Sequence, residues 1–254
     1  MRKPFAHRVG GVLSADIAVP DHKKEVAFYS QILTTGIDPL WREDLTNNTG
    51  TPIIGLGVRL PEYEALPLQW MPHFQVADIA TSVARTLELG GKELMHGKDD
   101  DGQSQWAVLT DQGGAAFGLI PVVPSESAID KIQRAGCITW LSLIASDTVA
   151  SQDFYKVVVG WSAKPVVVED GEGQHTGYEM QMSNGDSAAE ICHASADYAG
   201  IPHVWLLSLP VDDFEESLRR VRSNGGEILK EMSEAKYAIV QDPVGVCIAL
   251  QAWQ

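Results

Sequence analysis

The stretch QDPVGVCIALQ, residues 241–251, places a tight turn, Asp-Pro-Val-Gly, directly before an apolar strand. A similar stretch, TDQGGAAFGLI, occupies residues 110–120. In both segments the strand that follows the turn carries no charged residue. Because two distant segments share a turn and the strand after it, the chain is predicted to contain an internal repeat.

A first pair of matching segments contains a strand, an aspartate and a short amphipathic run. IAVPDHKKEVAFYSQIL (17–33) matches LIASDTVASQDFYKVVVGW (143–161), and in each a Phe-Tyr pair follows seven residues after the aspartate, Asp21 or Asp147. An aspartate at this place predicts a helix N-cap, because its carboxylate accepts hydrogen bonds from the amides of the first turn. Each phenylalanine is expected to pack its helix onto a sheet.

A second pair of segments repeats the same order. FQVADIATSVARTLELGGKEL (74–94) matches LPVDDFEESLRRVRSNGGEIL (209–229), with Asp78 and Asp213 as the expected N-caps. Both helices end at a Gly-Gly pair, where glycine adopts the left-handed C-cap conformation most easily. A strand, a helix and about three strands therefore recur four times, in modules that begin near residues 10, 69, 137 and 203.

This order predicts an α+β protein made of four tandem βαβββ modules. Modules 1 and 2 are expected to form an N-terminal domain over residues 1–122, and modules 3 and 4 a C-terminal domain over residues 136–254. Residues 123–135 are interpreted as a linker because proline, serine and charged residues gather there.

Tandem modules with a strand-Asp-helix-Phe-Tyr start and an Asp-Pro-x-Gly end resemble the vicinal oxygen chelate superfamily of glyoxalases, bleomycin-resistance proteins and dioxygenases. LQWMPHFQVADI (68–79), VLTDQGGAAFGLIP (108–121) and HVWLLSLPVDDFEESLRRV (203–221) are similar to its two-domain, single-chain branch, which includes mycobacterial glyoxalase-like antigens. The resemblance covers nearly the whole chain. It implies two glyoxalase-like domains, each a half-barrel pair of cupped sheets with the ligand inside the cup.

The resemblance also implies where a metal would bind. Metal enzymes of the superfamily place a histidine on a module's first strand, seven residues before the capping aspartate, and a glutamate on the last strand. Imidazole and carboxylate groups are natural ligands of divalent ions. In this chain the histidine positions are occupied by Ser14, Met71, Trp140 and Leu206, and two of the glutamate positions by Gly118 and Ala249.

We therefore expect neither a metal nor another cofactor, and the sequence argues against glyoxalase I and extradiol dioxygenase activity. Glu190, on the predicted last strand of module 3, stands where some members carry a metal-binding glutamate, but by itself it cannot hold an ion. It is alternatively a solvated carboxylate at a strand end. The residues predicted to line the ligand cups are Ser14, Met71, Trp140, Ser142, Leu206, Ser208 and Glu190.

A second ring of inward-facing positions lies two residues further along each first strand, because side chains alternate between the faces of a strand. It contains Asp16, His73, Ser142 and Ser208. A carboxylate that orients an imidazole is a general-base arrangement, so Asp16 and His73 are candidate catalytic residues. Alternatively the two form a satisfied polar pair, do not meet, or make a weak, displaced metal site.

The tryptophans divide by strand parity. Trp140 faces the cup, where it offers an apolar wall and one N–H donor for a flat organic molecule, or alternatively fills the cup. Trp70 and Trp205 have the opposite parity and are expected in the core. GEGQHTG (171–177) lacks the lysine and hydroxyl residue of a phosphate-binding loop and is interpreted as a hairpin loop.

Composition excludes several classes of partner. Asp and Glu number 34 and Lys and Arg 19, a net charge of −15, which argues against nucleic acid and anionic membrane surfaces. No apolar run approaches the roughly 20 residues that span a bilayer, and no secretory signal is expected at the N-terminus. Three cysteines without CxxC spacing indicate a reducing compartment, so a cytoplasmic location is expected.

Three functions remain open from the sequence. The first is metal-independent binding of a small organic molecule, akin to the resistance-protein branch. The second is a metal-independent lyase, isomerase or hydrolase that uses Asp16 and His73. The third is an interaction protein whose cups are filled by side chains such as Trp140 and Met71. Either a monomer or a homodimer is compatible with two cups in one chain.

Overall fold

The computed structural model describes residues 4–33, 41–42, 54–124, 138–170, 173–195, 198 and 200–252. Module 1 contains β1 (Val12–Val19), α1 (His22–Leu33), β2 (Trp41–Arg42), β3 (Ile54–Val58) and a short 3-10 helix, η1 (Pro61–Tyr63). Module 2 contains β4 (Met71–Val76), α2 (Ile79–Glu88), β5 (Lys92–Lys98), β6 (Ser104–Thr110) and β7 (Ala116–Pro121). No helix in this part of the chain is long and apolar enough to cross a lipid bilayer.

Modules 3 and 4 repeat the pattern. Module 3 contains β8 (Trp140–Ala145), α3 (Thr148–Val158), β9 (Ser162–Asp170), β10 (Gly173–Gln181) and β11 (Ser187–His193). Module 4 contains β12 (Trp205–Val211), α4 (Phe214–Ser223), β13 (Glu227–Met232), β14 (Tyr237–Gln241) and β15 (Cys247–Ala252). The predicted α+β fold of four glyoxalase-like modules with cupped sheets is confirmed.

The helices begin and end where the sequence signals place them. The carboxylates of Asp78, Asp147 and Asp213 accept hydrogen bonds from the amides three residues later, at 2.7, 2.9 and 3.0 Å. The helices α2 and α4 stop at Gly90 and Gly225, whose φ angles are 85° and 84°. A residue with a Cβ adopts this conformation only at a cost, so the glycines fix the ends of both helices.

In each module the first strand pairs in parallel with the last described strand, and this pairing sets the register of the cup wall. The inward ring expected from the sequence lies directly opposite one position of the last strand. The four pairs are Asp16 with Gly55, His73 with Gly118, Ser142 with Glu190, and Ser208 with Ala249.

The chain forms two compact units that are not continuous in sequence. Unit 1 contains residues 1–13, 71–126 and 141–205, and unit 2 contains residues 14–70, 127–140 and 206–254. Modules 2 and 3 thus share unit 1, and modules 1 and 4 share unit 2. The division into domains at 1–122 and 136–254 stays a prediction, and most of the expected linker lies outside the described residues.

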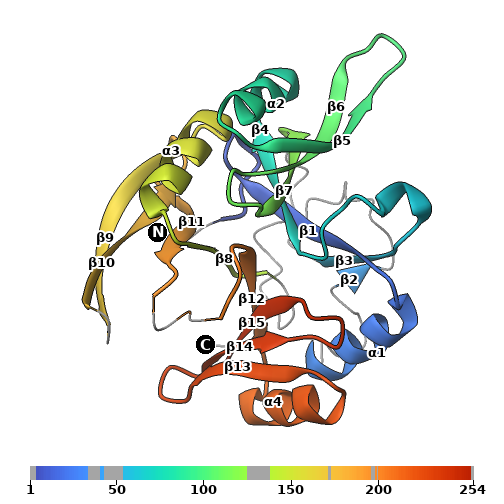
Figure 1. The fold of residues 1–254 in the computed structure, drawn as a ribbon, viewed down its shortest axis with the longest axis vertical. Helices are drawn as coiled ribbons and strands as arrows, with labels where there is room; N and C mark the ends of the chain where they lie inside the picture. Colours follow the sequence, from blue (N-terminus) through green and yellow to red (C-terminus); the bar gives the residue numbers. More distant parts are fainter. Residues whose placement is uncertain are drawn as a thin grey trace. The chain divides into compact units, whose positions relative to one another are not determined.

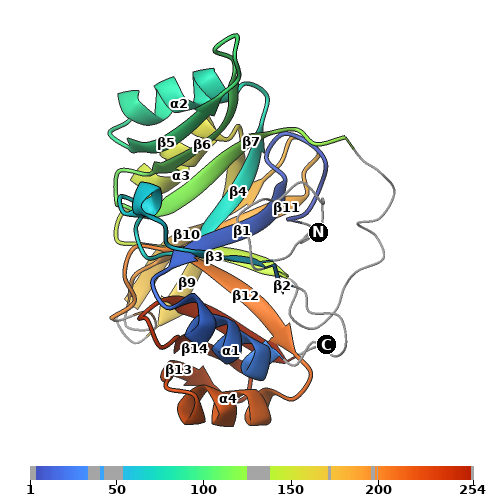
Figure 2. The same ribbon diagram turned by 90° about the vertical axis from the view of Figure 1, so that its right-hand side faces the viewer.

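Unit 1 is built around α2 and α3, which pack side by side (Figures 1 and 2). Its strands follow the orders β4-β7-β6-β5 and β8-β11-β10-β9. Ser82 Oγ in α2 donates to the carbonyl of Val158 in α3 at 2.8 Å. The core is aromatic, since Phe74 contacts the rings of Phe117, Tyr155 and Trp205 at centroid distances between 5.4 and 6.1 Å.

Unit 2 repeats this arrangement with α1 and α4, which lie next to each other in Figure 2. Its strands follow the orders β2-β3-β1 and β13-β14-β15-β12. Ser217 Oγ in α4 donates to the carbonyl of Ile32 in α1 at 2.8 Å, as Ser82 does in unit 1. Trp70 and Trp205 are each 1% exposed, so their prediction as core residues is confirmed.

The two sequence motifs that define the repeat are bonded to each other. In unit 1, Tyr155 of module 3 donates its hydroxyl to the turn aspartate Asp111 of module 2 at 3.2 Å, and Trp205 Nε1 donates to the Tyr155 oxygen at 2.9 Å. His203 Nε2 lies 2.9 Å from the same aspartate. In unit 2, Tyr29 of module 1 donates to Asp242 of module 4 at 2.9 Å.

Unit 2 contains a buried carboxyl group, Glu25, where the equivalent helix of unit 1 has the hydroxyl of Ser151. Glu25 is fully buried near Asp242, and neither of its carboxylate oxygens has a hydrogen-bond partner among the described residues. Burial, followed by the charge of Asp242, raises the pKa of Glu25 to about 8. The equivalent residue of α3 is Ser151, four positions after its N-cap. Glu25 is therefore mainly protonated in the folded protein at neutral pH.

The raised pKa of Glu25 predicts that folding stability falls as pH rises. The folded state keeps this proton up to about pH 8, whereas the unfolded chain releases it near pH 4.5. Between about pH 5 and about pH 8, the free energy of unfolding of the wild type should fall by about 3 kcal/mol relative to that of Glu25→Gln. Urea denaturation of both proteins across this range measures the difference.

Glu88→Gln, at the exposed end of α2, is the matched control, and its stability should stay parallel to that of the wild type. A Glu25→Gln profile that also runs parallel to the wild type would contradict the raised pKa of Glu25.

Removal of the Tyr155 hydroxyl should also destabilise the fold. Tyr155→Phe leaves Asp111 without one donor and Trp205 Nε1 without its acceptor, and both groups are buried. We expect a loss of about 1–3 kcal/mol in the free energy of unfolding, measured in urea. Tyr63→Phe, whose hydroxyl makes no hydrogen bond within the described chain, should change it by less than about 0.5 kcal/mol. Equal effects of the two substitutions would refute the role of the buried bond.

Candidate functional site

The positions at which the superfamily's metal enzymes carry histidine are closed to solvent in this protein. Ser14, Met71, Trp140 and Leu206 are each at most 4% exposed. Serine, methionine, tryptophan and leucine side chains do not supply the imidazole that such a site needs. The described residues include no group of three or more His, Cys, Asp or Glu side chains that could hold a metal ion. The residues present thus do not fit the superfamily's metal set.

In module 2 the place of the metal-binding glutamate is taken by a glycine, and the space is used by a histidine. A Cβ atom built on Gly118 would lie 2.4 Å from Cδ2 of His73, which is closer than two carbon atoms can approach. His73 therefore packs directly over the Gly118 backbone. Any side chain at position 118 would collide with this imidazole.

The candidate catalytic pair is divided between the compact units. Asp16, which is 2% exposed, belongs to unit 2, and the half-buried His73 belongs to unit 1. Their general-base pairing stays a prediction.

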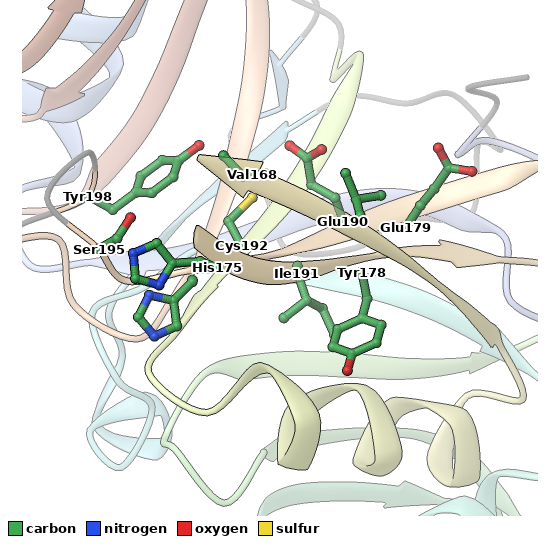
Figure 3. A pocket seen from close by; sticks show the side chains of 12 residues that line it. Val168, His175, Tyr178, Glu179, Glu190, Ile191, Cys192, Ser195 and Tyr198 are labelled. Atoms are coloured by element: carbon green, nitrogen blue, oxygen red, sulfur yellow. The ribbon is translucent and has the colours of Figure 1, made fainter. Parts of the chain in front are cut away.

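A pocket with a volume of about 220 Å³ lies within unit 1, on strands β9, β10 and β11 of module 3 (Figure 3). Its polar lining includes the side chains of Glu179, Glu190, His175, His193, Cys192 and Tyr198. Val166 and Val168 supply the apolar part of the wall. A concave site of this kind, mainly apolar with a few polar groups, is typical of small-molecule binding.

Strand alternation decides which side chains face this pocket. Glu179 on β10 lies directly opposite Glu190 on β11. Figure 3 shows both carboxylates and Cys192 on one face of the strands, with Tyr178 and Ile191 pointing to the other face, where α3 packs. The pocket thus occupies the face that the helix leaves open, which is the inner face expected for the cup.

Each of the two carboxylates accepts a hydrogen bond from a neutral side chain. Ser142 Oγ donates to Glu190 Oε1 at 2.6 Å, and Gln181 Nε2 donates to Glu179 Oε1 at 2.8 Å. Hydrogen bonds from Ser187 and then from Gln181 lower the pKa of Glu179, because they stabilise its charged form. The Glu179 carboxylate is consequently ionised at neutral pH.

One end of the pocket is aromatic. The imidazole rings of His175 and His193 are stacked, with centroids 4.3 Å apart and planes 8° from parallel. His193 Nδ1 is buried and has no hydrogen-bond partner among the described residues. Tyr198 lies beside this end in Figure 3. A buried nitrogen without a partner is unfavourable, so a ligand donor or acceptor that reaches it would be stabilised.

Two of the residues singled out from the sequence lie at this pocket. Glu190 lines the pocket and Ser142 holds it. The other residues predicted to line a cup do not contribute to this pocket: they are Ser14, Met71, Trp140, Leu206 and Ser208. The interpretation of 171–177 as a hairpin loop is wrong for residues 173–177, because these pair with β9 as part of β10 and bring His175 into the lining.

Glu179 was detectable from the turn between β10 and β11. Asn184-Gly185 is a strong hairpin signal, and counting outward from it on both sides pairs position 179 with position 190. The structure has this register, with an irregularity next to Met180. Glu179 could thus have been found by extending the hairpin from its turn.

Comparisons with known proteins agree with this geometry. Residues 13–120 match the Glyoxalase-like domain, and residues 137–250 match the Glyoxalase/Bleomycin resistance protein/Dioxygenase superfamily. The chain belongs to this superfamily. The family resemblance inferred from the repeated motifs is therefore confirmed.

Relatives of this superfamily member include "Putative glyoxylase CFP32" of Mycobacterium tuberculosis, which is 22% identical over 191 residues, covering 74% of this chain and 70% of the relative. "Anthracycline biosynthesis protein DnrV" of Streptomyces peucetius is 28% identical over 131 residues, which is 45% of this chain and 46% of that protein.

Solved structures share the fold at low sequence identity. Homoprotocatechuate 2,3-dioxygenase from Brevibacterium fuscum has a TM-score of 0.57 at 12% identity, covering 95% of this chain and 80% of the other. The Mn(II)-bound glyoxalase from Novosphingobium aromaticivorans has a TM-score of 0.51 at 14% identity, covering 96% and 82%. At this identity the likeness extends to the fold alone.

A substitution at Gly118 tests whether the His73 imidazole fills the space above this residue. Gly118→Ala should lower the free energy of unfolding by about 1–3 kcal/mol, because the new methyl group forces the imidazole to move. In a His73→Ala background the same substitution should cost much less, which a double-mutant cycle in urea measures. Additive effects of the two substitutions would show that the imidazole is not the group displaced.

Proposed function

We propose that the protein binds a small organic molecule in the pocket on β9, β10 and β11, and that it does so without the metal-ligand set of the superfamily's enzymes. The observation that carries this proposal is a pocket on the inner face of module 3 that combines apolar walls, two carboxylates and stacked imidazoles. Module 3 also keeps a carboxylate, Glu190, at the last-strand position where modules 2 and 4 have glycine and alanine.

The size of the pocket limits the ligand. Its volume of about 220 Å³ lies below the range of about 300–1,000 Å³ that is common for drug-sized ligands. One ring with short substituents, or one part of a larger molecule, fits such a volume. The Streptomyces relative is named for anthracycline biosynthesis, which supports an organic ligand for this chain as well.

The remaining features of the proposal follow from the sequence. The net charge of −15 disfavours nucleic acid and anionic membranes as partners. The protein is proposed to act in the cytoplasm, as a monomer or a homodimer, with no bound cofactor.

A ligand screen with a blocked pocket tests this function. Flat, one-ring organic compounds that bind should raise the melting temperature of the wild type. Val168→Trp should remove these shifts, because Val168 lines the pocket and the larger ring would fill it. Val167→Trp is the matched control, since Val167 is the adjacent, exposed residue of β9 outside the pocket lining, and it should keep the shifts.

Differential scanning fluorimetry with and without a chelator measures both parts of the proposal. Shifts that survive EDTA support metal-independent binding, and shifts that EDTA abolishes would overturn that part. A broad screen without any shift, or equal shifts in the Val168→Trp protein, would overturn binding at this pocket.

A further inference from the structure

The hairpin of β5 and β6 in module 2 carries a serine, a histidine and a glutamate that are joined by hydrogen bonds. Ser104 Oγ lies 2.8 Å from Nε2 of His96, and Nδ1 of the same imidazole lies 3.2 Å from Glu93 Oε2. When Nδ1 carries the proton, it donates to the carboxylate and leaves Nε2 to accept from the serine hydroxyl. In this order a histidine activates a serine nucleophile, and a carboxylate orients the histidine.

Two shifts in the strand register bring the three side chains to one face of the hairpin. Glu93 and His96 are three residues apart, so a regular strand would point them to opposite faces. The register shifts once after Glu93 and again before Lys98. The cross-strand pairs on the shared face are Glu93 with Leu109, His96 with Ala107, and Lys98 with Ser104. Irregularities of this kind re-aim side chains and are common next to active sites.

The imidazole is held in place, and the serine remains within reach of small molecules. The side chain of His96 is only 10% exposed, whereas Ser104 is half-buried. On the other face of the hairpin, the indole of Trp106 packs against the backbone of Gly97, which supports the strand next to the histidine. The turn of this hairpin lies beyond α2 in both views (Figures 1 and 2). Groups fixed on paired strands keep their geometry better than groups on loops.

A positive charge lies next to the serine. Lys98 is directly opposite Ser104 in the register, a placement that brings two Cβ atoms to about 4.5–5.5 Å. Lys98 is exposed and makes no ion pair with another residue that the structure describes. Its ammonium group is therefore available to the negative charge that develops on a carbonyl oxygen when a serine attacks the carbonyl carbon.

We propose that Ser104 is a nucleophile that accepts acyl groups from small activated esters, with His96 as its general base. Ser104 Oγ forms a bond to the carbonyl carbon of the ester and gives its proton to His96 Nε2. The bond between this carbon and the alcohol oxygen then breaks, and the alcohol leaves with that proton. Water that gives a proton to the same imidazole attacks the acylated serine, so that the acid is released and the serine is restored.

The place of the site defines the class of substrate. Ser104 lies on an open hairpin, so the site suits unhindered esters with a good leaving group. Glu93 is a positioning residue that orients the imidazole, and Lys98 supplies the positive charge. None of these residues lines the pocket of module 3, so this inference does not depend on the proposed binding function.

Two reactive probes test the nucleophile. With p-nitrophenyl acetate, the wild type should release p-nitrophenolate at least about tenfold faster than Ser104→Ala, because only the wild type has the activated hydroxyl. A fluorophosphonate should label the same oxygen, since Oγ forms a bond to phosphorus and fluoride leaves. Mass spectrometry of peptides from the wild type should locate the label on Ser104. A wild type without label on Ser104, or equal release by the Ser104→Ala protein, would overturn the proposal.

Substitutions assign the roles of the neighbouring groups, with the rate of Ser104 labelling as the measurement. His96→Gln should slow labelling about 100-fold or more, because it removes the general base. Glu93→Ala should also slow it, and added acetate should restore part of the rate by replacing the lost carboxylate. Lys98→Gln should slow labelling without abolishing it. Ser223→Ala is the matched control, because Ser223 is an exposed serine that donates to a backbone carbonyl and should not affect labelling.

The outcomes separate a chemical role from a structural one. Urea denaturation of each variant shows whether it is folded under the conditions of labelling. Unchanged labelling in folded His96→Gln would overturn the proposal, and a lack of rescue by acetate would overturn the role of Glu93. Unchanged labelling in Lys98→Gln would overturn the role of Lys98. Val168→Trp should label as fast as the wild type, so failure of the pocket and failure of the nucleophile are distinguishable.

Discussion

Buried hydrogen bonds between tyrosine and aspartate join segments that are far apart in the chain. In unit 2, Tyr29 donates to Asp242, which lies 213 residues later, and in unit 1 Tyr155 donates to Asp111. The other carboxylate oxygen of each aspartate accepts hydrogen bonds from two backbone amides of its own turn. One carboxylate thus fixes a turn and anchors a helix from another module, in surroundings where a lost hydrogen bond is costly. Since each turn leads directly into a last strand, the bond also fixes where that part of the cup wall begins.

The copies of the scaffold carry different chemistry around the same anchor. In unit 1 the aspartate is next to a histidine, His203, and in unit 2 the corresponding aspartate is close to the buried Glu25. The residues that face each other on the first and last strands also differ from module to module. The same backbone positions recur in the modules, whereas the side chains around them differ. In module 3 the side chains at and near these positions line a pocket that includes two carboxylates.

Local signals explain which parts of this arrangement the sequence could predict. N-cap aspartates and C-cap glycines act within one turn of a helix, so the helix boundaries follow from them directly. Strand alternation is also a local signal, and it correctly predicted that Trp70 and Trp205 lie in the core. The grouping of modules into compact units depends on contacts between modules that are far apart in the chain. All four modules have the same local sequence signals, so these signals do not reveal which modules pack together. Glu179 was missed because its place opposite Glu190 depends on the register of a hairpin.

The packing of His73 over Gly118 has an evolutionary consequence. A metal site of the kind found in the superfamily's enzymes would need a carboxylate at position 118, but a Cβ atom there would lie 2.4 Å from Cδ2 of the imidazole. The glutamate would be tolerated only after the histidine had changed, and the histidine, changed first, would leave an empty space above a glycine. Each single step is disfavoured, so the two positions are epistatic. The histidine and the glycine thus constrain each other, and this module could gain a carboxylate at position 118 only if both residues changed together.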